Sequence, residues 1–183
     1  MRGIIVISLT LLLGLIPVWA QNDQPEETKI EPLPALTPLV RGAELPRLAV
    51  FDIYENRFDS AEQLHLRWVL VCFIQTDDSL SLKQIPSLRQ LFKEFSDHLC
   101  LVLVDAGDSS VEILKRFRLM QSLENAVILQ DYYKLITHEF SVESQIPTTV
   151  LADTSGIIQF VHYGPLEKGE VYSAIKNAMA PKP

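Results

Sequence analysis

Residues 68–74, Trp-Val-Leu-Val-Cys-Phe-Ile, form an apolar run that no polar residue interrupts. A strand with one face in water alternates apolar and polar residues, whereas a strand covered on both faces is apolar throughout. Residues 99–104 form a second run of the same kind. Strands that are buried on both faces need helices on each side, so these two runs predict the centre of a layered α/β sheet.

Helices are predicted between and after these runs. Within residues 81–98, apolar residues recur every three or four positions, at Ile85, Leu88, Leu91, Phe92 and Phe95. This spacing is typical of a helix with one buried face. Residues 111–120 show the same pattern after a serine at 109 or 110 that can cap a helix. Strand and helix alternate twice, and right-handed crossovers then make the two strands parallel.

The C-terminal third favours strands at residues 126–129, 148–152 and 157–163, followed by a helix at 167–179. Asp153-Thr154-Ser155-Gly156 predicts a hairpin turn between the last two strands. Residues 48–64 predict a short strand or hairpin around Glu55-Asn56. The fold class expected is α/β: three layers, with a central mixed sheet between helices and a C-terminal β-hairpin and helix.

The N-terminus indicates an exported chain. Residues 1–20 combine Arg2, an apolar run and small residues at 18 and 20, as in a signal peptide cleaved before Gln21. An uncleaved anchor is the alternative. Residues 21–46, rich in proline and acidic side chains, are predicted to be a linker, and residues 47–180 the domain. No membrane span is expected after cleavage, and the periplasm or secretion are the locations considered.

Charge and cysteine content restrict the chemistry. The net charge of −7 argues against nucleic acid as a partner and favours basic or neutral partners. Cys72 and Cys100 each lie inside an apolar run, which predicts two buried thiols; a disulfide is the alternative if the strands are neighbours. The four histidines are scattered, so no metal site and no cofactor are expected.

The order of elements resembles the thioredoxin superfamily, in particular its exported TlpA/ResA-like branch. The resemblance spans roughly residues 48–179. Its motifs are Val69-Leu70-Val71-Cys72-Phe73-Ile74-Gln75-Thr76, Ile85-Pro86-Ser87-Leu88, Gln145-Ile146-Pro147-Thr148-Thr149-Val150-Leu151-Ala152-Asp153 and Ser155-Gly156-Ile157-Ile158. The resemblance implies that residues 145–153 contain the cis-proline segment of that superfamily.

The chain departs from the superfamily at the active-site loop. There the family carries Cys-x-x-Cys at a helix N-terminus, which lowers the pKa of the attacking thiol. This chain has a degenerate loop without sulfur, and the resemblance places Asp78 and Ser81 at the two cysteine positions. Its residues of interest are Thr76, Asp77, Asp78, Ser79 and Ser81. Without a thiolate and a resolving thiol, disulfide exchange has no route, so no catalytic residue is assigned and the chain is not expected to be an enzyme.

Ligands of open α/β sheets collect at the carboxyl ends of parallel strands. That edge should bring together residues 76–81, 105–108 and the Ile146-Pro147-Thr148 segment, with Asp77, Asp78, Asp105 and Asp108 as one acidic patch. In the superfamily, the cis-proline loop pairs with an extended peptide. The resulting hypothesis is a redox-inactive, exported module that binds or assembles an extracytoplasmic protein or extended peptide. Two alternatives are an enzyme that uses Ser79 or Ser81 with a thiol ligand such as glutathione, and a purely structural subunit.

Overall fold

The computed structural model describes residues 39–166 and 169–180, so the predicted signal peptide and residues 21–38 of the predicted linker lie outside the described residues. The strands are β1 (Ala49–Phe51), β2 (Arg57–Asp59), β3 (Trp68–Ile74), β4 (Leu99–Asp105), β5 (Val127–Gln130), β6 (Thr148–Ala152) and β7 (Ile158–Tyr163). The helices are α1 (Ser60–Leu64), α2 (Ser79–Phe95), α3 (Val111–Met120), α4 (Leu135–Glu139) and α5 (Glu170–Met179).

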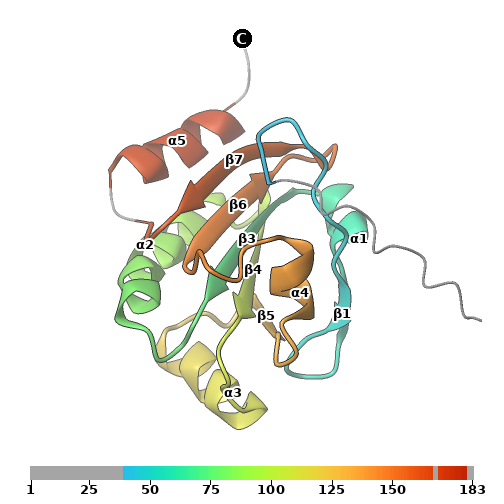
Figure 1. Ribbon diagram of the computed structural model, residues 1–183. Helices are drawn as coiled ribbons and strands as arrows, with labels where there is room; N and C mark the ends of the chain where they lie inside the picture. Colours follow the sequence, from blue (N-terminus) through green and yellow to red (C-terminus); the bar gives the residue numbers. More distant parts are fainter. Residues whose placement is uncertain (1–38, 167–168, 181–183) are drawn as a thin grey trace, which may run out of the picture. The chain divides into compact units, whose positions relative to one another are not determined.

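Five strands form the central sheet in the order β5-β4-β3-β6-β7 (Figure 1). The strands β3, β4 and β5 are parallel to one another, while β6 runs antiparallel to β3 and β7 antiparallel to β6. The two apolar runs are neighbouring strands: β3 is buried from Val69 onward, and β4 along its whole length. The predicted α/β class with a mixed sheet is therefore confirmed.

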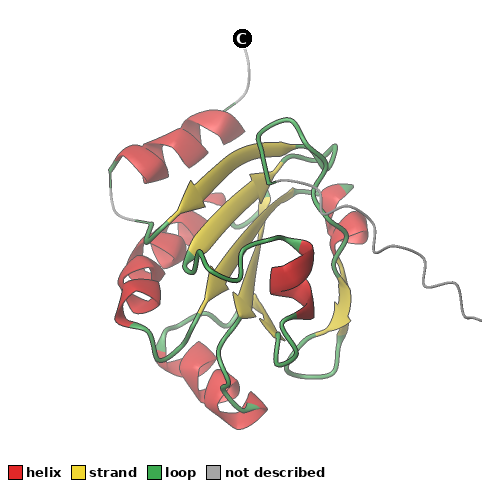
Figure 2. Ribbon diagram, viewed as in Figure 1, coloured by secondary structure: helices red, strands yellow, loops and turns green. Residues whose placement is uncertain are grey.

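Helices cover both faces of the sheet (Figure 2). One face packs against α2, α3 and α5 through side chains such as Leu88, Leu114 and Ile175. The other face packs against α4, α1 and the β1–β2 hairpin, with Phe140 and Phe58 in its core. Since each face of β3 and β4 has its own apolar layer, their continuous hydrophobic sequence is satisfied on both sides.

Helix α4 has no counterpart among the sequence-based predictions. It has five residues, too few to show a hydrophobic period. Asp131 stabilises its start from outside the helix, because the N–H groups of Ile136 and Thr137 donate to the Asp131 carboxylate at 3.0 and 2.8 Å. Lys134, at the N-terminal boundary of α4, adopts a left-handed backbone conformation with φ of 57°.

The predicted boundary between linker and domain at residues 46 and 47 is too late in the chain. Leu39 and Leu45 are buried in the core on the α4 face. The Gly42 N–H donates to the Ile158 carbonyl and the Ile158 N–H to the Ala43 carbonyl, both at 2.8 Å. Residues 39–46 therefore pack along β7 as part of the domain, because their leucines supply apolar surface that the sheet needs covered.

The packing of α4 gives a test of this face of the core. Phe140 is fully buried, with its ring centroid 5.0 Å from that of Phe73. We expect Phe140→Ala to lower the free energy of unfolding by about 3–5 kcal/mol through lost burial and a new cavity. Urea unfolding measures this loss. Tyr133→Ala, at a side chain that is 78% exposed, should change stability by less than about 0.5 kcal/mol, and similar losses in both variants would contradict the packing described.

Candidate functional site

A polar cavity of about 490 Å³ lies at the carboxyl edge of the sheet, where the parallel strands β3 and β4 end. It is lined by Gln75, Thr76, Asp77, Ala106, Gly107, Asp108, Ser109, Ile113 and Lys134. The loop that follows β3 and the loop that follows β4 thus meet, as the topology predicts for the ends of neighbouring parallel strands.

Asp78 and Ser81, which the resemblance places at the cysteine positions, form the cap of α2. The Ser81 N–H donates to the Asp78 carboxylate at 2.8 Å, and this backbone hydrogen bond lowers the pKa of Asp78. The buried Ser81 hydroxyl in turn accepts the Gln75 N–H at 3.0 Å. Ser79 is exposed. Of the two serines considered for a thiol ligand, Ser81 is therefore occupied by the loop itself.

Asp105 lies beneath the cavity and not on its surface. Its side chain is fully buried, and its Oδ1 accepts the Thr76 N–H at 3.1 Å. Its Oδ2 has no hydrogen-bond partner among the described residues. Burial raises the pKa of Asp105 above its ordinary value. The prediction of a surface patch of four carboxylates is thus wrong for Asp105. This residue is the last of β4, and the loops that follow the strands cover it.

Lys134 brings a positive charge to the cavity that the sequence reasoning missed. Its ammonium group lies 3.6 Å from the Asp108 carboxylate and donates to the carbonyl groups of Ala106 and Gly107. Lys134 follows β5, which is parallel to β4. Ligands collect at the carboxyl ends of parallel strands, so including the end of β5 in the sequence analysis would have found this lysine. With Asp78 in a cap and Asp105 buried, Asp77 and Asp108 remain as exposed carboxylates.

Two hydroxyl groups join the loops across the cavity. The Thr76 and Ser109 hydroxyl oxygens lie 2.6 Å apart, and the Gln130 side-chain amide donates to the Ser109 carbonyl at 2.6 Å. These bonds connect the ends of β3, β4 and β5. The cavity walls are therefore held by side-chain contacts between separate strands and do not depend on one loop alone.

The Ile146-Pro147 peptide bond is cis. The Pro147 carbonyl accepts the Gly164 N–H at 2.7 Å, and Thr148 begins β6 opposite Tyr163. The backbone N–H and carbonyl of Ile146 have no backbone partner among the described residues. None of Ile146, Pro147 and Thr148 lines the polar cavity, so the structure does not merge this segment with the other two into one pocket.

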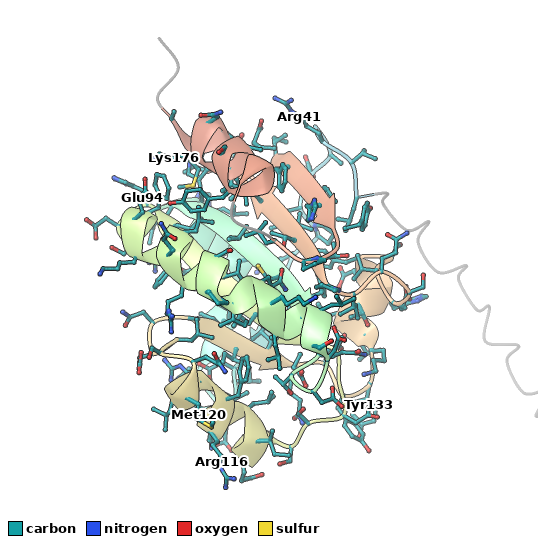
Figure 3. The ribbon with its side chains drawn as sticks, turned by 90° about the vertical axis from the view of Figure 1, so that its left-hand side faces the viewer. Arg41, Glu94, Arg116, Met120, Tyr133 and Lys176 are labelled. Atoms are coloured by element: carbon teal, nitrogen blue, oxygen red, sulfur yellow. The ribbon has the colours of Figure 1, made fainter. Side chains whose placement is uncertain are left out.

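Large apolar side chains flank the cavity, and sequence reasoning missed these as well. We call this set the apolar rim. Its members are Leu80, Ile113, Tyr132, Tyr133 and Leu135, with exposed fractions of 44%, 53%, 57%, 78% and 70%. Tyr133 lies beyond the N-terminal end of α2 in Figure 3. Ile113 lines the cavity itself, and Tyr133 and Leu135 adjoin Lys134 in the chain. The edge therefore combines a polar centre with exposed apolar surface.

Neither sulfur lies at this edge. Cys72 pairs with Leu103 and Cys100 with Val69, so the cysteines are offset by three residues, roughly 10 Å along the strands. They also belong to cores on opposite faces of the sheet. A disulfide needs Cα atoms within about 7 Å and converging side chains. Both are free, buried thiols, so the predicted buried state is confirmed and the disulfide alternative is wrong.

The burial of the two sulfurs also determines their acidity. Desolvation raises the pKa of Cys72 to about 12 and that of Cys100 to about 11. The Thr149 hydroxyl donates to the Cys72 sulfur at 3.8 Å and offsets only part of that effect. Within the described part of the chain, no cluster of His, Cys, Asp and Glu has metal-binding geometry, and no helix is long and apolar enough to cross a bilayer.

Comparison with known proteins identifies the fold. The thioredoxin domain of a thiol-disulfide oxidoreductase from Bacteroides vulgatus superposes with a TM-score of 0.63 at 22% identity, covering 76% of this chain and 97% of that one. A thiol:disulfide interchange protein of the thioredoxin family from Chlorobium tepidum gives a TM-score of 0.62 at 21% identity, covering 77% and 99%. The chain thus has a thioredoxin-like fold.

The sequence match to a curated protein covers a smaller part of the chain than the structural matches do. The thioredoxin-like protein YneN of Bacillus subtilis is 29% identical over 91 residues, which are 49% of this chain and 52% of that protein. The match thus spans about half the length of this curated relative. No family model matches the chain.

The buried carboxylate predicts a pH-dependent stability. Because burial raises the folded-state pKa of Asp105, the native protein keeps a proton that the unfolded chain releases, and this group destabilises the fold as the pH rises through that interval. We expect Asp105→Asn to gain stability relative to the wild type at about pH 7, and the gain to shrink near pH 4. Urea midpoints measure it. The control is Glu124→Gln, at an exposed loop. If the stability difference between Asp105→Asn and the wild type is the same at both pH values, the argument is refuted.

The buried thiols predict low reactivity. At pH 7 a thiol with a pKa of about 12 is ~10⁻⁵ ionised, and burial also blocks access. We expect no thiol of the native protein to react within minutes with a disulfide reagent such as Ellman's, and both to react after unfolding in guanidinium. A native thiol that reacts as fast as free cysteine would contradict this, and Cys72→Ala and Cys100→Ala would identify it.

Proposed function

We propose that this thioredoxin-like domain is a redox-inactive binding module that holds an extended protein segment at the carboxyl edge of its sheet. The observation that carries the proposal is the composition of that edge. A polar cavity is flanked there by the exposed apolar rim, whereas both sulfurs lie within the two cores on opposite faces of the sheet.

The arrangement of the α2 N-terminus supports a role without thiol exchange. Exchange needs a thiolate at an accessible position and a second thiol within reach of the mixed disulfide. Here Asp78 and Ser81 occupy the helix start, and their polar groups already bond the backbone of the loop. Neither Cys72 nor Cys100 can reach this position without leaving its core.

The exposed groups indicate the chemistry of the partner. Tyr132 and Tyr133 pack edge to face, with ring centroids 5.1 Å apart, and offer an amphipathic surface that suits protein contacts. The carboxylates of Asp77 and Asp108 favour a basic side chain, with Lys134 close by to limit the net negative charge. The backbone groups of Ile146, which pair with no other backbone group of the described residues, suit pairing with an extended chain.

The setting we propose is outside the cytoplasm, on the basis of the signal-like residues 1–20. The periplasm fits the resemblance to the TlpA/ResA-like branch. The partner is then an extracytoplasmic protein with an accessible segment that is apolar and basic. Such a segment places its apolar side chains on the rim and its cationic group at the two carboxylates.

The test is capture of the partner with matched charge variants. The wild type, Asp77→Lys/Asp108→Lys and the control Asp97→Lys/Glu124→Lys are immobilised and exposed to the native extracytoplasmic fraction with crosslinking. All four substituted residues are exposed, and both variants change the net charge equally. We expect the edge variant to bind the captured partner about tenfold or more weakly, and the control to bind as the wild type does.

Binding of the purified partner, measured by calorimetry, provides the decisive comparison. The three proteins need equal thermal midpoints for the comparison to hold. If the edge variant and the control retain the partner equally, binding occurs on another face and the proposal fails. Capture through a mixed disulfide that Cys72→Ala abolishes would likewise refute a redox-inactive role.

A further inference from the structure

A second cavity, of about 520 Å³, lies at the end of the domain opposite to the carboxyl edge. It is open to solvent on one side and is lined by residues at the start of β3, the end of α2 and the end of α5. Figure 3 shows Glu94 and Lys176 facing each other at this end of α2, with Tyr133 of the apolar rim beyond the other end. The two cavities are therefore separate, and the proposed function uses only the first.

The walls of this second cavity are largely apolar. Trp68, Phe95 and Met179 line it and are only partly buried, because their inner surfaces pack against the core on the α2 face. Leu66 also lines it and is 75% exposed. Side chains that are anchored in the core on one side and open on the other provide a firm apolar surface for a ligand.

The charged side chains on the cavity walls are Glu94, Lys176 and Arg67, and they carry one more positive than negative charge. Glu94 is neutralised, since its carboxylate lies 2.6 Å from the Lys176 ammonium and accepts a hydrogen bond from the Tyr172 hydroxyl. Arg67 differs. Within the described residues its guanidinium donates only to the neutral Gln63 side chain, from Nε and Nη2 at 3.2 and 2.9 Å.

Among the described residues, no carboxylate lies within ion-pair distance of Arg67. Its Nη1 makes no hydrogen bond to the described part of the chain. An uncompensated arginine beside apolar side chains is notable in a chain of net charge −7. It leaves donors that an anionic group can use, and the planar guanidinium suits a carboxylate.

We propose that this cavity binds a small amphipathic carboxylate. The apolar body of the ligand lies against Trp68, Phe95 and Met179, and its carboxylate accepts hydrogen bonds from Arg67. The volume is within the range of small-molecule sites, about 300–1,000 Å³. The Glu94–Lys176 pair joins α2 to α5 at the wall of the cavity.

Dodecanoate is a suitable probe, and 1-dodecanol is its neutral counterpart. Trp19 and Trp68 are the two tryptophans of the chain, so Trp19→Phe in the full chain leaves Trp68 as the reporter inside the cavity. We expect saturable binding of dodecanoate below its micelle concentration, followed by Trp68 fluorescence and by calorimetry. The alcohol should bind about tenfold or more weakly, because it lacks the charge that pairs with Arg67.

Variants separate the charge from the apolar contact. Arg67→Gln should weaken dodecanoate about tenfold and leave the alcohol unchanged, whereas Arg67→Lys should retain part of the difference. Met179→Asp should weaken both ligands. Asp77→Lys, at the other end of the domain, is the control and should change neither. Thermal midpoints of the unliganded variants verify that each one is folded.

The inference is overturned if binding does not saturate, if dodecanoate binds no more tightly than the alcohol, or if the Arg67→Gln variant binds dodecanoate as the parent does. Loss of dodecanoate binding in Asp77→Lys would place the ligand at the carboxyl edge and would also contradict it. Because partner capture at that edge is measured separately, failure of this inference leaves the proposed function unaffected.

Discussion

The parallel pairing of β3 with β4, buried on both faces, is the constraint on which the rest of the structure depends. It requires an apolar layer on each side, which α2, α3 and α5 supply on one face and α4 with the β1–β2 hairpin on the other. The same pairing places the loops after both strands at one edge, where the polar cavity forms. It also separates the sulfurs, because Cys72 and Cys100 occupy positions of opposite parity in the paired strands and therefore face different cores.

In the loop between β3 and α2, polar side chains satisfy backbone groups of the loop itself. Asp78 and Ser81 satisfy the first N–H groups of the loop and helix, which is a stabilising role that needs no sulfur. Asp105 accepts the Thr76 N–H from below, and the other oxygen of this buried carboxylate has no hydrogen-bond partner among the described residues. Around this capped loop, Lys134 and the apolar rim form a surface that differs in chemistry from a thiol site. Such a surface suits binding through charge and apolar contact.

The long helix α2 separates two sites of different character. At its N-terminal end the cavity is polar and flanked by exposed aromatic rings, which suits a protein segment. At its C-terminal end the cavity is apolar, and among the described residues no carboxylate lies within ion-pair distance of Arg67. Because the two cavities lie at opposite ends of α2 and share no lining residue, the proposed ligand and the proposed partner do not compete for the same surface.

The sequence by itself determined the elements with a clear hydrophobic period and the residue types of the loop after β3. The unbroken runs at 68–74 and 99–104, the helical spacing from Ile85 to Phe95, and a loop at 76–81 without cysteine can all be read locally. Tertiary structure alone decided the burial of Asp105, the packing of residues 39–46 and the place of Lys134 at the cavity. It also decided which face each cysteine occupies and that Arg67 has no anionic partner within the part of the chain that the structure describes. These features depend on strand register and on contacts between segments far apart in the chain, which no local pattern of residues encodes.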